Sequence, residues 1–579
     1  MATEFRRIPG VADPRRRRSG PARHRDAWGF GTAAPARSPF PTRRRRFAGA
    51  RRERRTSWTT VALTLGYVAA GLYGVNALRT FVRVDVAVAG IKPHAVLTSA
   101  AAAQATVSFT IDPGNVVDRT VLTLDGKPVA RADRQVQGST ISFRPGTLVE
   151  GRHDIVVSVP RPGMGPSRVH RQFVIDDTPP TIDVPALLPA ASISQPMTIT
   201  GKVESSATLT LDGAPLSHKN GTFSLHYDRP PAAPLHLVAT DTAGNETTAE
   251  VIAPVLYPGG QGIHVTAAAW GYEPLRKGVL DLIDSKVVSS VELDLKDEGG
   301  IVGYDSKVPL ANQIGAVRPE YNLKDTVADL KRRGVRVIGR IVAFRDAPLA
   351  QWAWANGRHD WVVQTAAGGM LDTYGGFTNP ANAEVHTYNL DIALEAAGAG
   401  VDDILWDYVR RPEGDPATML IPGLPGSTSN AIVDFLAGTH AALRARGVFQ
   451  GAAVFGIAAD NPEVVGQDIP RMARNVDYLA PMLYPSHWTN GEYNVKNPNK
   501  QPADIIKASL ADFQGKIDGT GKALMPWLQD FSLGVPYGPT EVRAQIDAAA
   551  SLGVGDWLLW NAEVTYTKGA LSPSLVKLH

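Results

Sequence analysis

Residues 260–579 alternate between short apolar runs and longer stretches with the period of an amphipathic helix. Helical periodicity is clearest at 321–333, 383–399, 430–446 and 539–552. Apolar runs lie at 262–269, 290–295, 336–342, 403–408, 452–458, 478–483, 523–528 and 557–560. Runs that are apolar on both faces are typical of buried parallel strands. The alternation therefore predicts a (β/α)8 barrel of the TIM type over 260–579.

Between residues 92 and 255 the hydrophobic period changes to two, and turn residues separate short runs. The sequence TVLTLDGKPV at 120–129 returns as ATLTLDGAPL at 207–216, with Asp-Gly predicting a hairpin turn in each copy. This pattern predicts two immunoglobulin-like β-sandwiches, over 92–177 and 178–255. A spacer role is favoured over sugar binding, because sugar sites expose aromatic rings and this region has no Trp.

Residues 57–78 carry no charge and read SWTTVALTLGYVAAGLYGVNAL. A helix of this length would span about 33 Å, enough for the apolar core of a bilayer. We expect a transmembrane signal anchor here. The alternatives are a cleaved signal peptide, with Ala87-Val88-Ala89 as the A-x-A site, and a buried soluble helix.

Arginine is concentrated in residues 1–56, which hold seventeen Arg and four acidic residues. Such a segment has little apolar surface to bury and repels itself, so it is expected to be disordered. The positive-inside rule places it in the cytoplasm and the later domains outside the cell, and no nucleic-acid partner is expected. The chain has no Cys, which excludes disulfides, thiol catalysis and Cys-ligated zinc.

Acidic residues follow several of the predicted barrel strands, where this fold carries its chemistry. Asp294 and Asp297 leave the second strand together with Lys296, in LDLKDEGG. Asp407 leaves the fourth strand in ILWDYVRRP, with Arg410 as the expected ion-pair partner.

Aromatic and amide side chains follow the same strands, as a sugar site requires for stacking and for binding hydroxyl groups. The candidate substrate contacts are Tyr408, Arg410, Tyr484, His487, Trp527, Gln529, Trp560, Asn561 and, on the first strand, His264.

The motifs LDLKDEGG, DDILWDYVRRP, APMLYPSHW, PWLQDF and LLWNA resemble the DUF4015 family, in this order and over about residues 262–570. The resemblance implies a TIM barrel with glycoside hydrolase activity. Two positions depart from the family pattern. Arg411 stands where members have Phe, and Ala453 stands where members have Asp before Val-Phe-Gly; Asp460 follows a few residues later.

Glycoside hydrolysis needs two carboxyl groups, one to donate a proton and one to act as nucleophile or base. Asp407 is the expected nucleophile or base, and the second carboxyl group is sought among Asp297, Asp294 and Asp460. The expected substrate is an extracellular or cell-envelope polysaccharide. The alternative is a non-catalytic glycan-binding surface protein, and two carboxyl groups roughly 5–10 Å apart across the barrel mouth would favour hydrolysis.

No cofactor and no metal are expected. The sequence has no H-E-x-x-H or H-x-H cluster, and no glycine-rich nucleotide motif follows a strand.

Overall fold

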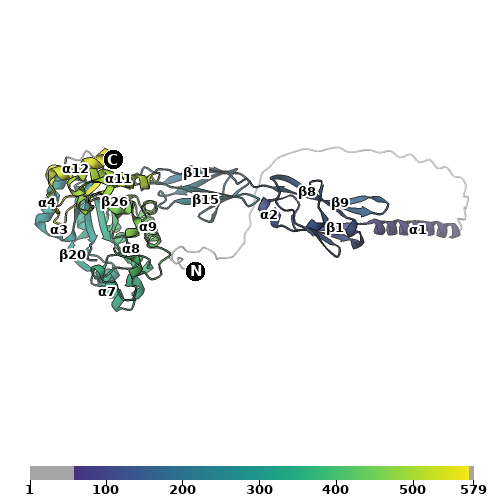
Figure 1. Ribbon diagram of the computed structural model, residues 1–579, viewed down its shortest axis with the longest axis horizontal. Coiled ribbons are helices and arrows are strands. Elements are labelled where there is room, and N and C mark those ends of the chain that lie inside the picture. The colour runs from purple at the N-terminus through teal and green to yellow at the C-terminus, as the bar shows by residue number, and fades with distance from the viewer. Residues whose placement is uncertain (1–57, 573–579) are drawn as a thin grey trace, which may run out of the picture. The chain divides into compact units, whose positions relative to one another are not determined.

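The computed structural model describes residues 58–572, and the predicted disordered segment 1–56 lies outside this range. Its C-terminal part is a closed parallel barrel (Figure 1), which confirms the predicted fold. The barrel strands are β17 (Gln261–Val265), β18 (Ser290–Lys296), β21 (Arg336–Val342), β23 (Asp403–Asp407), β25 (Phe449–Phe455), β26 (Tyr478–Met482), β27 (Ala523–Leu524) with β28 (Trp527–Gln529), and β29 (Trp557–Trp560). Because β17 pairs with both β18 and β29, the sheet has no free edge at this point.

Helices surround the barrel in Figure 1. They are α3 (Ala267–Gly271), α4 (Glu273–Asp284), α5 (Pro309–Gln313), α6 (Leu323–Arg332), α7 (Ala347–Ala355), α8 (Ala383–Ala399), α9 (Thr428–Arg444), α10 (Ile469–Ala473), α11 (Pro502–Ile517) and α12 (Pro539–Ser551). The first barrel strand is shorter than predicted. Thr266 accepts a hydrogen bond from the Ala269 amide and so caps α3, which ends the strand at Val265.

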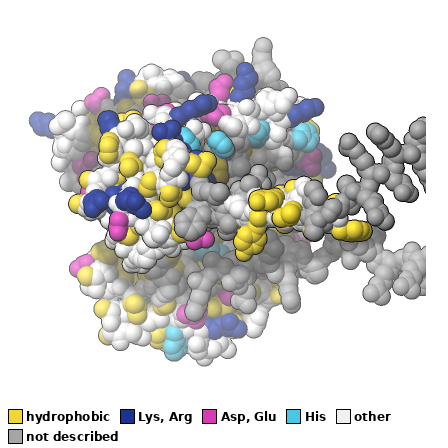
Figure 2. Space-filling view, turned by 90° about the vertical axis from the view of Figure 1, so that its right-hand side faces the viewer, with side chains coloured by type: hydrophobic (Ala, Val, Ile, Leu, Met, Phe, Trp, Pro, Cys, Tyr) yellow, Lys and Arg dark blue, Asp and Glu magenta, His cyan; other side chains and the backbone are white. Residues whose placement is uncertain are grey.

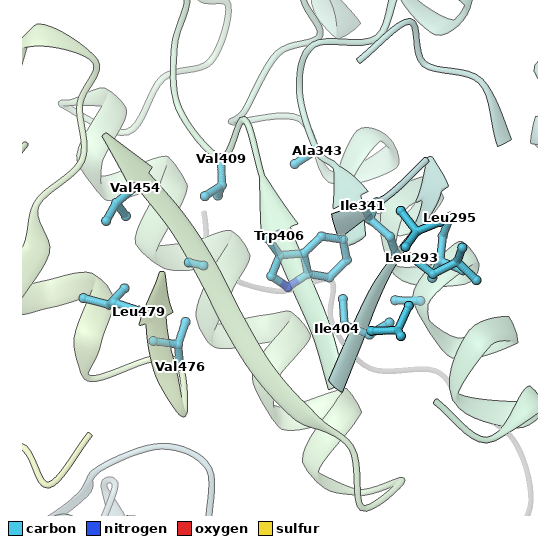
Figure 3. Close-up of a cluster of buried hydrophobic side chains, with 14 of the residues drawn as sticks. Leu293, Leu295, Ile341, Ala343, Ile404, Trp406, Val409, Val454, Val476 and Leu479 are labelled. Carbon is cyan, nitrogen blue, oxygen red and sulfur yellow. The ribbon is translucent and has the colours of Figure 1, made fainter. Parts of the chain in front are cut away.

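Apolar side chains fill the space between the strands and the helices. Figure 3 shows the Trp406 indole among side chains that come from five barrel strands and their connections. Its ring meets Phe435 of α9 edge-on at 4.9 Å, and its N–H donates to Gln450 Oε1 at 2.9 Å. This packing fixes β23, the strand that ends at Asp407.

Strand β18 is buried along its whole length and carries three charged residues among apolar ones. A register shift between Asp294 and Lys296 breaks the two-residue alternation of the strand. Lys296 donates to Asp346 Oδ2 at 2.7 Å and to Asn389 Oδ1 of α8 at 2.8 Å. Lys296 therefore ends β18 with its buried ammonium group directed to the helix layer that covers the barrel.

The described residues before the barrel form four antiparallel or mixed sheets. The first pair is β1-β3-β7-β6 and β2-β9-β8-β4-β5; the second is β10-β11-β14 and β13-β12-β15-β16. Their strands are β1 (Asp85–Ala89), β2 (Ala95–Leu97), β3 (Val107–Asp112), β4 (Val121–Leu124), β5 (Lys127–Pro128), β6 (Arg134–Gln137), β7 (Thr140–Phe143), β8 (Gly151–Arg161), β9 (Met164–Ile175), β10 (Ile182–Asp183), β11 (Met197–Val203), β12 (Thr208–Leu211), β13 (Ala214–Leu216), β14 (Thr222–Tyr227), β15 (Leu235–Thr240) and β16 (Glu246–Val251).

The repeated Asp-Gly sequences form matched hairpins between β4 and β5 and between β12 and β13. Asp125 and Gly126 have φ of 51° and 77°, and Asp212 and Gly213 have φ of 48° and 79°. Positive φ at both central residues is what a tight hairpin turn requires, so the predicted turns are confirmed. The assignment of these regions to the immunoglobulin-like class stays a prediction.

Residues of the charge-free segment form helix α1 (Trp58–Val82). Among the described residues, however, no helix combines the length and the apolar character that crossing a membrane requires. The predicted transmembrane helix is thus not supported, since Thr, Gly and Asn dilute the apolar residues of α1.

On the molecular face seen in Figure 2, basic side chains are scattered among acidic and neutral ones.

Candidate active site

A cavity of about 570 Å³ lies over the carboxyl ends of the barrel strands. Its lining combines charged groups with aromatic rings: Glu298, Arg340, Asp407, Tyr408, Arg410, Glu413, Phe455, Tyr484, His487, Trp488, Trp527 and Trp560. This volume lies within the usual range for small-molecule sites, about 300–1,000 Å³. Because the cavity lies at the carboxyl ends of the strands, it is at the position where a TIM barrel carries its chemistry.

Arg340 of β21 is the centre of the charged groups at the base of this cavity. Its Nε and Nη2 donate to Asp407 Oδ2 at 2.9 and 2.6 Å, and its Nη1 donates to Asp294 Oδ1 at 2.6 Å. Its Nη2 also donates to Glu298 Oε1 at 2.5 Å. One buried guanidinium thus orients three carboxyl groups that come from two other barrel strands and the loop after β18.

The predicted pairing of Asp407 with Arg410 is wrong. Arg410 donates to Glu413 Oε1 at 2.8 Å, and its guanidinium lies over the rings of Tyr408 and Phe455 at 4.6 and 4.5 Å. Strand register explains the difference, since β21 and β23 are hydrogen-bonded neighbours and bring Arg340 beside Asp407. Arg410 still lines the cavity, as a cationic wall.

Asp407 is held at the point where β23 ends. Its Oδ1 accepts a hydrogen bond from the Tyr408 amide at 2.7 Å. Tyr408 has a φ of 47°, an uncommon conformation for a residue other than glycine, and Arg345 donates to its hydroxyl at 2.8 Å. Backbone strain at a strand end that faces a cavity is a common feature of functional sites.

Asp297 and Glu298 are neighbours in sequence with different surroundings. Asp297 Oδ1 accepts hydrogen bonds from the Gly299 and Ile301 amides and so closes the loop after β18. Glu298 instead lines the cavity. Because Glu298 Oε1 and Asp407 Oδ2 lie 2.5 and 2.6 Å from the same nitrogen, these oxygens are at most 5.1 Å apart, the sum of the two distances.

Burial and charge act in opposite directions on the acids around Arg340. Burial by itself would raise the pKa of Glu298, but the charge and hydrogen bond of Arg340 outweigh it and lower this pKa to about 2. For Asp294 burial dominates and raises the pKa to about 7, against the opposing charges of Arg340 and His264. The two carboxyl groups therefore differ in protonation near neutral pH.

His264 lies beneath the cavity among the buried acids rather than on its lining. Its Nδ1 is 2.5 Å from Glu292 Oε2, and its Nε2 is 3.7 Å from Asp294 Oδ2. Ligand atoms of these three residues lie within 4.8 Å of one another, a spacing at which a metal ion could bind. His264 already contacts Glu292 Oε2 and Arg340 already donates to Asp294 Oδ1 there, so one oxygen of each acid is engaged by the protein itself.

The predicted aromatic contacts form one wall of the cavity. The ring of Tyr484 lies 5.4 Å from that of His487 and 5.7 Å from that of Trp560. Trp527 lies 5.8 Å from His264, at the base of the wall. Aromatic faces in this arrangement can stack on the apolar faces of sugar rings.

Other predicted site residues have structural contacts. Gln529 accepts from the Ser486 amide at 3.0 Å and donates to the Phe531 carbonyl at 2.9 Å. Asn561 donates to the carbonyls of Asp530 and Thr565. Asp460 is exposed, beyond the turn Gly456–Ala459. These three side chains brace or border the loops around the cavity.

The sequence prediction missed Arg340, Glu298 and Glu292. The sequence contained two signals of buried charge. One is the arginine within the apolar run VIGRIV, and the other is the pair of acids at alternate positions of VELDL. Each places a charge inside a strand that is buried on both faces, and such a charge requires a partner.

The family model DUF4015, described as "Putative glycosyl hydrolase domain", matches residues 262–566. No curated protein matches the chain. Among solved structures, a hypothetical protein from Ruminiclostridium thermocellum is 27% identical and matches over 33% of this chain and 96% of its own, with a TM-score of 0.30. The PgaB glycoside hydrolase domain from Bordetella bronchiseptica is 16% identical, with 53% and 94% covered and a TM-score of 0.41. An endo-1,4-beta-D-mannanase from Thermotoga petrophila is 13% identical, with 53% and 92% covered and a TM-score of 0.36.

Proposed function

Because the chain belongs to the DUF4015 family of glycosyl hydrolase domains, we propose that its barrel hydrolyses a glycosidic bond of a polysaccharide at Asp407 and Glu298. The observation that carries this proposal is the pair of carboxyl oxygens, at most 5.1 Å apart, the sum of 2.5 and 2.6 Å, at the base of an aromatic-lined cavity. Two carboxyl groups at the base of a sugar-sized cavity are the minimal machinery of glycoside hydrolysis.

The separation of the pair favours one stereochemical course. Carboxyl groups about 5–5.5 Å apart are typical of retaining enzymes, whereas inverting enzymes keep them about 6.5–9.5 Å apart to admit a water molecule. Glu298 is anionic at neutral pH, since Arg340 lowers its pKa to about 2, and suits the role of nucleophile. Asp407 would then be the acid–base group, instead of the nucleophile or base expected from the sequence. It has to take up a proton in the substrate complex before it can donate one to the leaving oxygen.

A panel of polysaccharides tests the proposal with the full chain, read as reducing ends released. We expect Asp407→Asn and Glu298→Gln each to lower kcat by at least about 1,000-fold, since each removes a group that acts in the transition state. Asp460→Asn is the matched control, because Asp460 is exposed and should leave the rate unchanged. Wild-type activity that persists in Asp407→Asn would refute the assignment.

Two observations favour glycan binding without hydrolysis as the second candidate. Arg340 contacts both carboxyl groups and lowers the pKa of Glu298 to about 2, and Ala453 occupies the β25 position where the family pattern has Asp. Retention of the chain on an immobilised glycan that it does not cleave would establish this alternative.

The cellular location stays a proposal that rests on the seventeen arginines of residues 1–56. If residues 57–78 anchor the chain in a membrane, these arginines favour a cytoplasmic N-terminus with the barrel outside the cell. Protease treatment of intact cells tests this placement, because an outward-facing barrel would be cleaved and a cytoplasmic one would be protected.

A further inference from the structure

The buried acids beneath the cavity outnumber the fixed cation that they surround. Glu292, Asp294 and Asp407 have side chains at most 4% exposed, and Arg340 lies among them at 3%. With Glu298, four carboxyl groups share one guanidinium. If all four were ionised and His264 were neutral, three negative charges would lack compensation at and beneath the base of the cavity.

Uncompensated charge of this kind is costly. Burying an ion without a partner is unfavourable even after the protein relaxes, so such groups take up protons or pair with cations. Glu292 Oε1 and Asp294 Oδ2 accept no hydrogen bond from any described residue. Both atoms therefore remain open to a positive charge or a proton.

His264 is placed to supply that charge. The residue is 2% exposed and lies between two acids, with Nδ1 at 2.5 Å from Glu292 and Nε2 at 3.7 Å from Asp294. A neutral imidazole has one N–H, whereas an imidazolium presents a donor to each acid. The two-sided acidic environment therefore fits the protonated ring.

We infer that His264 is a buried imidazolium that acts as a positioning residue: its charge keeps Arg340 on Asp407 and Glu298, and loss of its proton sets the alkaline limit of activity. When His264 loses its proton, Asp294 and Glu292 lose one of their two counter-charges. Arg340 Nε lies 3.9 Å from Glu292, so the guanidinium is then drawn toward these acids and away from the catalytic pair. This inference rests on the proposed function for its effect on catalysis, but not for the charge of the ring.

The groups that face His264 act on its pKa in opposite directions. Burial lowers the pKa of His264, but the charges of Glu292 and Asp294 and the hydrogen bond of Glu292 raise it by more, against the weaker effect of Arg340. Glu298, Asp407 and Tyr484 lie beyond Arg340 at the cavity, and the Tyr566 hydroxyl donates to the His264 carbonyl at 2.5 Å. The Tyr321 hydroxyl donates to the Asp294 carbonyl at 2.8 Å.

The direct test measures the charge of the ring in the full chain with 15N-labelled histidine. We expect the nitrogen shifts of His264 to report an imidazolium at a pH at which an ordinary histidine has already lost its proton. His440 is the matched control. It is 1% exposed and lies 3.2 Å from Asp477, but burial lowers its pKa, so it should be neutral.

Two variants assign the signal and extend the test. His264→Gln should remove the signal, and Glu292→Gln should move its titration to lower pH because one of the two acids is gone. If His264→Gln does not fold, the shift in Glu292→Gln still makes the assignment. A neutral His264 throughout the pH range would overturn the inference.

Kinetics separates this inference from the proposed function. On a substrate that is hydrolysed, kcat should fall as pH rises through the His264 titration, with KM nearly constant. In His264→Gln, kcat should be about 10- to 100-fold lower at pH 6 and flat in this range, as expected for a misplaced catalytic group. If the fall of kcat with rising pH that the wild type shows persists in His264→Gln, the inference is overturned. An imidazolium at His264 in a chain that cleaves no glycan would refute the proposed function alone.

Discussion

Replacing Arg340 with Met is the sharpest test of the charge arrangement at the base of the cavity. The substitution keeps an unbranched apolar side chain but removes the donors to Asp407, Asp294 and Glu298. Asp294 holds a proton up to about pH 7, because burial raises its pKa to that value. The buried carboxyl group left without its partner is then that of Asp407, whose side chain is 4% exposed, whereas the Glu298 side chain is 36% exposed.

The expected loss of stability follows from the proton that Asp407 must then take up. Adding a proton to an ordinary aspartic acid at pH 7 costs about 1.36 kcal/mol for each of about three pH units, or about 4 kcal/mol. This agrees with the 3–5 kcal/mol, roughly, that breaking a buried ion pair costs. At pH 5 only about one unit separates the solution from the ordinary pKa, so the loss should shrink to about 1.5 kcal/mol.

Urea titration followed by tryptophan fluorescence measures this loss. Nine of the eleven Trp residues lie in the barrel, so the signal reports its unfolding. Arg543→Met is the matched control: the Arg543–Asp547 pair on α12 is 43% and 59% exposed, and such pairs contribute at most about 1 kcal/mol. A loss for Arg340→Met that does not exceed the control, or that is equal at pH 5 and pH 7, would refute the reasoning.

Two further substitutions test the packing and the wall of the cavity. Lys296→Met should cost about 3–5 kcal/mol in the same titration because it leaves the fully buried Asp346 without its partner. Lys277→Met, on the exposed face of α4, is the control and should leave the free energy of unfolding unchanged. Equal losses of stability in Lys296→Met and Lys277→Met would contradict the prediction. Trp560→Ala should weaken glycan binding about tenfold by calorimetry through the loss of one stacking face. Trp354→Ala is its control, because the Trp354 ring stacks on His359. Equal glycan affinity of the two variants would exclude stacking of a sugar on Trp560.

The pattern of the sequence was sufficient for the fold of the C-terminal half. Runs that are apolar on both faces, separated by amphipathic stretches, have few stable arrangements other than a parallel sheet covered by helices. The same local information placed Asp407 at a strand end and the repeated Asp-Gly pairs in hairpin turns. Residues 58–82 form a helix, and no helix among the described residues is both long and apolar enough to cross a membrane.

Ion pairing in the site was decided by the closed barrel. Along the chain, Arg410 is three residues from Asp407 and Arg340 is sixty-seven residues away, yet β21 and β23 lie side by side and bring Arg340 into contact. Asp297 and Glu298 are adjacent, and the turn after β18 directs one into its own hydrogen bonds and the other to Arg340. The sequence determined which residues stand at the strand ends, since this depends on local periodicity. Which of them meet depends on strand register and loop closure, which join residues far apart in the chain only when the barrel forms.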